Sequence, residues 1–122
     1  MSNLDRFFVS RYQDAYKLFD TDDHDTCMEL MRELLQEPQL SRGYRLKACS
    51  VMADGLMHQD WEEAESWRQQ AEKVYAEIRE LWPLGSEEAL KWPKQEEDLV
   101  QSRKDLDELE TDMKAAKPQD EN

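Results

Sequence analysis

The chain of 122 residues has few of the residues that interrupt helices or strands. It contains only three glycines and four prolines, and its two cysteines are too few for a disulfide framework. Apolar runs are short, residues 7–9 being typical of the longest, so we expect no membrane-spanning segment. The N-terminus lacks the basic stretch and apolar core of a signal peptide. We therefore expect an intracellular protein, cytoplasmic or nuclear, that does not bind membranes.

Basic residues are scarce relative to acidic ones. The chain contains 16 Lys and Arg and 29 Asp and Glu, which gives a formal net charge of −13. Nucleic-acid binding needs clustered Lys and Arg, so nucleic acid is not expected as a direct partner. An acidic surface instead attracts a basic one. The chain still contains 39% apolar residues, including four Trp, four Tyr and three Phe, which is too many for a wholly disordered protein.

The spacing of apolar residues predicts an all-α fold. Apolar side chains recur three or four residues apart, and no segment shows the alternation typical of strands. Capping residues and prolines bound the predicted helices. These helices run from Ser2 or Asn3 to about Asp20, from Asp22 or Asp23 to Pro38, from Ser41 past Leu56, from Asp60 to Trp82, and over 93–115, with a short turn over 86–92. We expect one domain over 1–115 and a disordered polar tail over 116–122.

Two segments that lie 37 residues apart share a pattern of residue types. An aromatic ring, a small residue and a further apolar or small residue recur at the same spacing in His24, Cys27 and Leu34 and again in Trp61, Ala64 and Ala71. Over about residues 8–78 this pattern resembles the helical-hairpin repeat of the tetratricopeptide family, whose period is about 34. A generic antiparallel helical bundle would also place small residues where its helices cross.

The resemblance implies two hairpins, over 3–37 and 41–82, and a capping helix over 93–115 that covers the exposed end of a two-repeat array. In the family, the first helices of the hairpins line a concave groove. The matching positions in this chain are Val9, Tyr12, Tyr16, Phe19, Leu46, Cys49, Ala53, Leu56 and Met57. An apolar and aromatic groove of this kind accepts an amphipathic helix. The chain's own last helix is the alternative occupant.

Candidate catalytic and metal-binding residues are few. The acidic turn over residues 20–25 resembles the start of a calcium loop, but Asp25 stands where the loop needs glycine and Met31 where it needs glutamate. His58 and Glu62 would lack at least two further zinc ligands. No glycine-rich phosphate loop and no motif of a serine hydrolase or zinc protease occurs. We expect no enzyme activity, no cofactor and no metal site.

These observations favour a non-catalytic protein-binding module, an adaptor or small scaffold subunit. Its partner would be another protein, bound through an apolar helix or a basic surface. A small acidic chaperone that masks an apolar client segment is one alternative. Another is a helical oligomer in which Leu99, Leu106 and Met113, each seven residues apart, form a coiled-coil seam. The sequence leaves the oligomeric state open.

Overall fold

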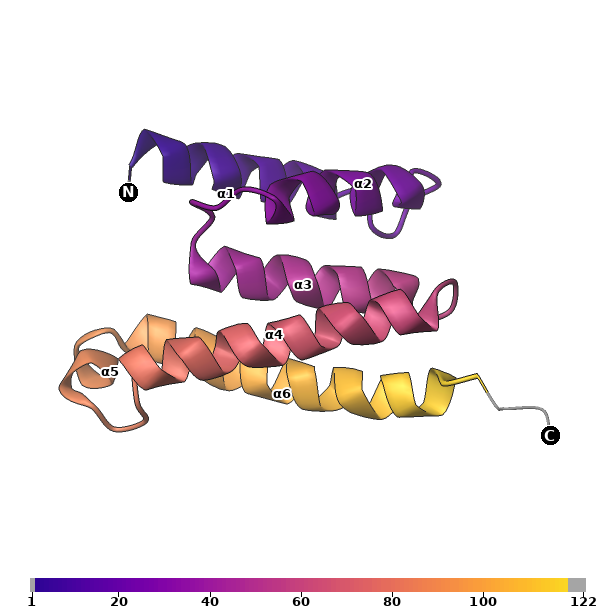
Figure 1. Cartoon of the computed structure of the whole chain (residues 1–122). Helices are drawn as coiled ribbons and strands as arrows, with labels where there is room; N and C mark the ends of the chain where they lie inside the picture. Colours follow the sequence, from indigo (N-terminus) through magenta and orange to yellow (C-terminus); the bar gives the residue numbers. More distant parts are fainter. Residues whose placement is uncertain (1, 119–122) are drawn as a thin grey trace.

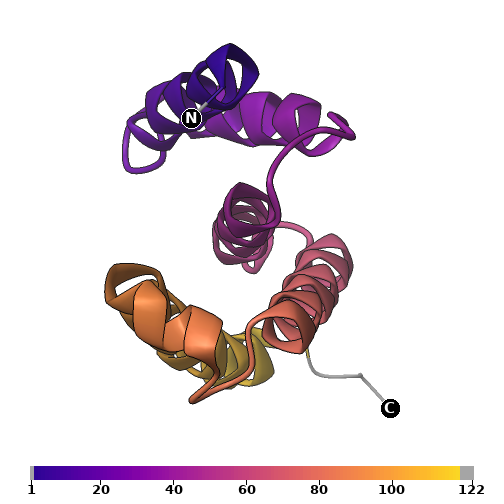
Figure 2. The same ribbon diagram turned by 90° about the vertical axis from the view of Figure 1, so that its left-hand side faces the viewer.

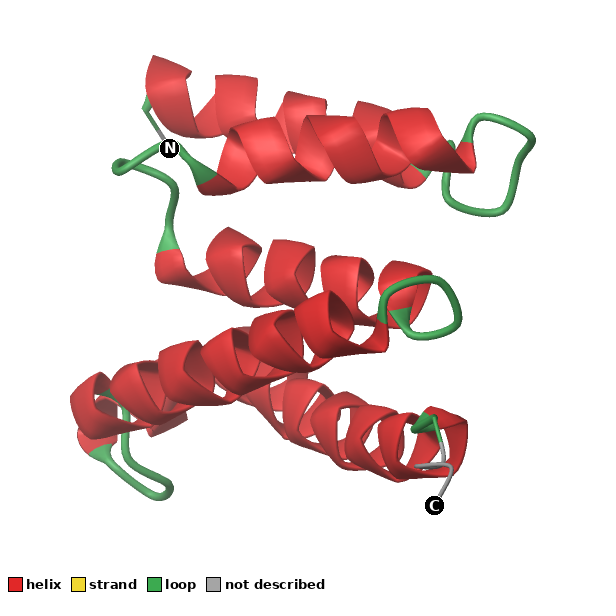
Figure 3. Cartoon of the chain, turned by 45° about the vertical axis from the view of Figure 1, so that its right-hand side comes forward, coloured by secondary structure: helices red, strands yellow, loops and turns green. Residues whose placement is uncertain are grey.

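A computed structural model describes residues 2–118 of the chain. Within them it has helices joined by short loops and no strand, as Figures 1 and 3 show, so the predicted all-α fold is confirmed. The sequence predicts a disordered tail over 116–122, but Ala116 is the last residue of the final helix. Residues 119–122 of this predicted tail lie outside the described residues. The helices are α1 (Asn3–Tyr16), α2 (His24–Leu35), α3 (Arg42–Leu56), α4 (Trp61–Leu81), α5 (Glu87–Lys91) and α6 (Pro93–Ala116).

Local sequence accounts for where the helices begin. Asp23 precedes α2 without a side-chain bond, and α6 starts at Pro93, whose missing N–H is not needed in a first turn. In the other four helices, the side-chain oxygen of the preceding residue accepts a hydrogen bond from the backbone N–H three residues later. These capping residues are Ser2, Ser41, Asp60 and Ser86.

The end of α1 differs from the sequence-based expectation. The apolar pattern predicts a helix to about Asp20, but α1 ends at Tyr16. The chain then forms tight turns in which the N–H of Phe19 bonds to the carbonyl oxygen of Tyr16, three residues back. The carbonyl oxygen of Phe19 is contacted by the imidazole of His24 instead of a helical N–H. A contact from a side chain five residues further along the chain therefore helps to end this helix.

The long helices reverse direction one after another along the chain, as Figure 1 shows. In the end-on view of Figure 2, α3 lies in the middle of a curved row, between α1 and α2 on one side and α4, α5 and α6 on the other. Accordingly α3 packs on α1, α2, α4 and α6, whereas α1 and α6 make no packing contact within the described residues. The curvature leaves α1 and α6 facing each other across α3.

One contiguous hydrophobic core connects α1, α2, α3, α4 and α6. Its most deeply buried side chains include Met31, Met52 and Leu106. α2 packs closely on α3 at Gly55, where a Cβ would lie 2.6 Å from the Met28 methyl carbon and the end of the Met28 side chain would have to shift. None of the helices in residues 2–118 has the length and apolarity that a membrane crossing requires.

Apolar and polar contacts together hold α6 against α4. The apolar stripe of α6, which comprises Leu99, Leu106, Leu109 and Met113, is buried. At one end of the contact, the indole Nε1 of Trp61 donates to the carbonyl oxygen of Met113 at 2.7 Å. Near the middle, the Arg103 guanidinium donates to both carboxylate oxygens of Glu72, at 2.8 and 2.7 Å. These contacts fix the face that α6 turns away from α4.

Candidate functional site

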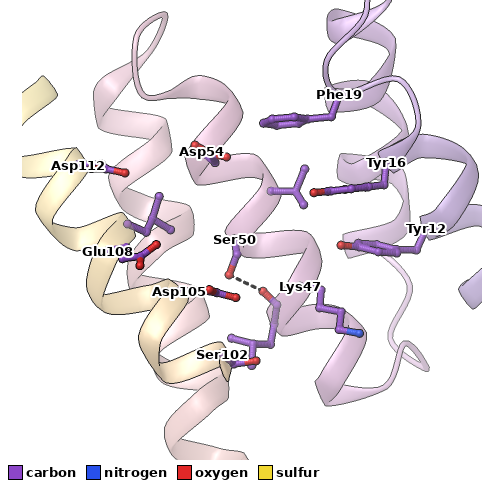
Figure 4. A pocket seen from close by; sticks show the side chains of 13 residues that line it. Tyr12, Tyr16, Phe19, Lys47, Ser50, Asp54, Ser102, Asp105, Glu108 and Asp112 are labelled. Atoms are coloured by element: carbon purple, nitrogen blue, oxygen red, sulfur yellow. Dashed lines mark hydrogen bonds between the residues drawn. The ribbon is translucent and has the colours of Figure 1, made fainter. Parts of the chain in front are cut away.

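A groove with a volume of about 500 Å³ lies between α1 and α6, with α3 as its floor. Figure 4 shows three aromatic rings on one side of it and a row of carboxylates on the other. The rings of Tyr12, Tyr16 and Phe19 form the first side, which we call the aromatic wall. The carboxylates of Asp105, Glu108 and Asp112 on α6 form the second side, which we call the acidic wall.

The aromatic wall is a row of rings produced by helical spacing. Tyr12 and Tyr16 lie one turn apart on α1, and their rings stack with centroids 5.9 Å apart. Phe19, in the turn after α1, continues the row at 6.0 Å from the Tyr16 ring. Tyr12 is half-buried against Tyr44, and this desolvation raises the pKa of its hydroxyl. Tyr16 is 52% exposed and presents its ring to the groove.

The acidic wall follows from the spacing of three residues on one face of α6. Positions 105, 108 and 112 are three and four residues apart, so their side chains point in the same direction. All three are exposed, and none forms an ion pair within the described residues. Asp105 accepts one hydrogen bond, from the Gln101 amide at 2.9 Å. The groove therefore has a negatively charged side without cationic partners.

Other carboxylates of α6 do have cationic partners. Glu96 pairs with Arg79 of α4 at 2.8 Å, and Glu110 lies 3.6 Å from the Arg68 guanidinium, also on α4. Glu96 and Glu110 thus have cationic partners on α4, whereas the three carboxylates of the acidic wall have none among the described residues.

The floor of the groove, formed by α3, combines apolar and polar residues. Leu46 and Val51 of α3 lie on it, and the Ser50 hydroxyl between them donates to the Leu46 carbonyl oxygen at 2.9 Å. Figure 4 shows Asp54 toward the Phe19 end and Lys47 toward the Tyr12 end. Lys47 is the one Lys or Arg among the residues that line this cavity.

The pKa of the Asp54 carboxyl depends on the surroundings of this residue in the groove. Partial desolvation raises the pKa of its carboxyl, and the carboxylate of Asp112 across the groove raises it further, with a smaller contribution from Asp20. His24 and His58 oppose this rise. Neighbouring carboxylates therefore disfavour the charged form of Asp54, and a cation placed beside it would relieve this repulsion.

The groove brings together four of the residues that the sequence predicts for it, namely Tyr12, Tyr16, Phe19 and Leu46. Val9 is half-buried on α1 and does not line the cavity. The other four predicted residues lie in the core, each no more than 5% exposed, and likewise do not line it; they are Cys49, Ala53, Leu56 and Met57. On α3 the groove is instead lined by residues 47, 50, 51 and 54 as well as Leu46.

The acidic wall is absent from the sequence-based prediction of the site. The sequence carries a signal for it, because Asp105, Glu108 and Asp112 share one helical face. That signal does not indicate which element lies opposite. The placement of this face across from α1 depends on how α6 crosses α4 and α3, which is a property of the packed fold.

The two cysteines are buried, and the ring of His24 is already engaged by the backbone. Burial raises the pKa of the Cys49 thiol to about 11 and also raises that of Cys27, which disfavours the reactive thiolate. Both ring nitrogens of His24 lie within hydrogen-bond distance of backbone carbonyl oxygens. In residues 2–118, no three His, Cys, Asp or Glu side chains are arranged to hold one metal ion. What the groove offers is an apolar surface beside a negative one.

Comparison with known proteins identifies no relative: no family model, no curated protein and no solved structure matches the chain. The groove is therefore interpreted from its own geometry and charge.

Proposed function

We propose that this chain is a non-catalytic protein-binding module, an adaptor or small scaffold subunit, that holds an amphipathic helix of another protein in the groove between α1, α3 and α6. The observation that carries the proposal is the aromatic wall, above all the 52% exposed ring of Tyr16. Tyrosine is enriched on binding surfaces because its ring is buried by a partner while its hydroxyl stays near water.

The dimensions of the wall suit a helical ligand. The centroids of neighbouring rings in the row lie 5.9 and 6.0 Å apart, so the row extends over at most about 12 Å, or about two turns of a helix. A helix bound in a groove presents its anchors at positions i, i+3 or i+4 and i+7, and these span the same length. The row of rings can thus contact two to three anchor side chains of one partner helix.

The packing of α3 on both α1 and α6 supports a tetratricopeptide-like arrangement, which we include in the proposal. Such an arrangement places the first helices of successive hairpins along one concave side. In this interpretation α6 caps the array and forms the far wall of the groove, and the chain's own last helix does not occupy it.

The small acidic chaperone is a second candidate, and a separate apolar surface favours it. Around α5, four large apolar side chains are at least half exposed, and a client segment could cover them: Leu81, Leu84, Leu90 and Trp92. A helical oligomer has less support. Its seam of Leu99, Leu106 and Met113 is buried within the chain, at 8%, 1% and 1% exposed.

Site-specific photo-cross-linking tests the proposal. The photoreactive amino acid benzoylphenylalanine would replace Tyr16 in the groove or, in a matched control, the exposed Glu29 on α2. In cells, we expect a discrete cross-linked protein from position 16 and none from position 29. A third variant carries the photoreactive amino acid in place of Leu90, on the exposed apolar surface around α5. Cross-linking from position 90 alone would favour the chaperone. No cross-link from position 16, in a variant that melts like the unmodified protein, would overturn the groove as the binding site.

A further inference from the structure

We propose that the helix bound in the groove is basic as well as apolar, with Lys or Arg along one edge facing the acidic wall and apolar anchors facing the aromatic wall. This inference rests on the proposed function of the groove and specifies the chemistry of its partner. It follows from the position of the acidic wall along the groove, from its spacing and from the absence of ion pairs at its three carboxylates among the described residues.

The unpaired state of the acidic wall is the first argument. Arginines on α4 pair with Glu96 and Glu110, so α6 has cationic partners where it packs on α4. Within the described residues, Asp105, Glu108 and Asp112 have none. A neutral ligand that covered these carboxylates would remove them from water without a compensating charge, which is unfavourable. A cationic ligand would compensate them.

The spacing of the wall is the second argument. Asp105 and Asp112 are seven residues apart, or about 10 Å along α6, which is close to the length of the row of rings opposite. Cations at two or three successive turns of a bound helix would therefore meet the carboxylates while its apolar face meets the rings. Lys and Arg side chains suit this role because their stems can pack on apolar surface.

The charge at the Phe19 end is the third argument. Asp54 of α3 and Asp112 of α6 both line this end. Lys47 lies toward the opposite end, as Figure 4 shows. Since the carboxylates follow one another along the groove and do not converge as metal ligands within residues 2–118, an extended cationic partner fits them better than a single ion. An acidic segment would be repelled along the same length.

A matched pair of synthetic peptides tests this inference on the full chain. Both are amphipathic helices of about 18 residues with the same leucine face, and they differ only in carrying lysine or glutamate along one edge. We expect the lysine peptide to bind at least about tenfold more tightly in fluorescence titrations near physiological salt, and its affinity to fall as salt rises. Spermidine, a flexible trication without an apolar face, serves as the third probe.

Two triple variants separate the acidic wall from the overall charge. The groove variant combines Asp105→Asn, Glu108→Gln and Asp112→Asn. The control variant combines Glu80→Gln, Glu97→Gln and Asp98→Asn, which are exposed, lie outside the groove and change the net charge equally. We expect the groove variant to bind the lysine peptide about tenfold more weakly and the control variant to change its affinity less than about twofold.

The outcomes distinguish this inference from the proposed function. If both peptides bind equally well and both depend on Tyr16, the groove binds helices but the basic partner is wrong. Equal losses in the two triple variants, or displacement of the lysine peptide by spermidine at matching concentration, would also overturn the inference, because charge alone would then explain binding. If neither peptide binds, or if Tyr16→Ala changes neither affinity, the proposed function fails as well.

Discussion

The Nε2 atom of His24 lies 3.1 Å from the carbonyl oxygen of Gly55 and connects the start of α2 to the end of α3. On the other side of the same ring, Nδ1 lies 2.8 Å from the carbonyl oxygen of Phe19. A carbonyl oxygen can only accept, so both bonds form together only when both nitrogens carry protons. The bond to Phe19 and then the bond to Gly55 raise the pKa of His24, assisted by Asp25 and Asp20 and opposed by desolvation.

The first prediction is a pH-dependent contribution of His24 to stability. Below the ordinary histidine pKa of about 6.5, the ring is charged in the folded and unfolded states, and both hydrogen bonds stabilise the fold. As the pH rises through the higher folded-state pKa, one bond is lost and this stabilisation declines. We expect His24→Phe to lower the free energy of unfolding by about 1–3 kcal/mol at pH 5.5 and by less at pH 8.5.

Urea unfolding of both proteins at several pH values measures this difference. His58→Gln is the control, because His58 is exposed and makes no side-chain hydrogen bond among the described residues. A loss in His24→Phe that is the same at every pH would show that the ring acts through packing alone.

The second prediction concerns the attachment of α6. Leu106 is 1% exposed and belongs to the core, whereas Val100 on the same helix is 40% exposed. We expect Leu106→Ala to destabilise the fold by about 2–5 kcal/mol, because it leaves a cavity between α6 and its neighbours. Val100→Ala should cost less than about 0.5 kcal/mol. Chemical denaturation compares the two, and equal small effects would indicate that α6 is only loosely attached.

The sequence predicts most of the helices because their signals are local. Ser41 and Asp60 cap α3 and α4 as expected, and the apolar stripe of α6 is buried as its spacing predicts. The end of α1 is not predictable in this way. Its apolar pattern continues past Tyr16, but the ring of His24 contacts the Phe19 carbonyl oxygen and favours a turn there.

The sequence predicts only part of the groove lining, because the packing of the helices decides which face of α3 meets the groove. The rings of Tyr12 and Tyr16 follow from the periodicity of α1, and Phe19 continues the row from the turn after this helix. The face of α3 that meets the groove is set by packing: Ala53 is fully buried, whereas its neighbour Asp54 lines the cavity. Successive residues of a helix point about 100° apart, so a rotation of α3 by this angle would exchange the buried position and the groove position. Hydrophobic spacing alone does not determine the rotation of α3.

The third prediction concerns the two cysteines. Cys27 is 0% and Cys49 1% exposed, and burial raises the pKa of both thiols. Because the thiolate is the reactive form, we expect both to react with a disulfide reagent at pH 8 far more slowly in the folded protein than in urea. The rates should rise together across the unfolding transition. Rapid labelling of either thiol in the folded protein would contradict its position in the core.

The last prediction separates support of the fold from contact with a partner on the aromatic wall. Tyr12 is half-buried, and its ring packs edge-on against Tyr44 at 5.3 Å, so Tyr12→Ala should lower the free energy of unfolding by about 2–3 kcal/mol. Tyr16 is 52% exposed, so Tyr16→Ala should cost less than about 1 kcal/mol. At a temperature where both variants are folded, Tyr16→Ala should still weaken binding of the lysine peptide about tenfold. Destabilisation of the two variants to the same extent would mean that the Tyr16 ring belongs to the core and leaves no open wall for a partner.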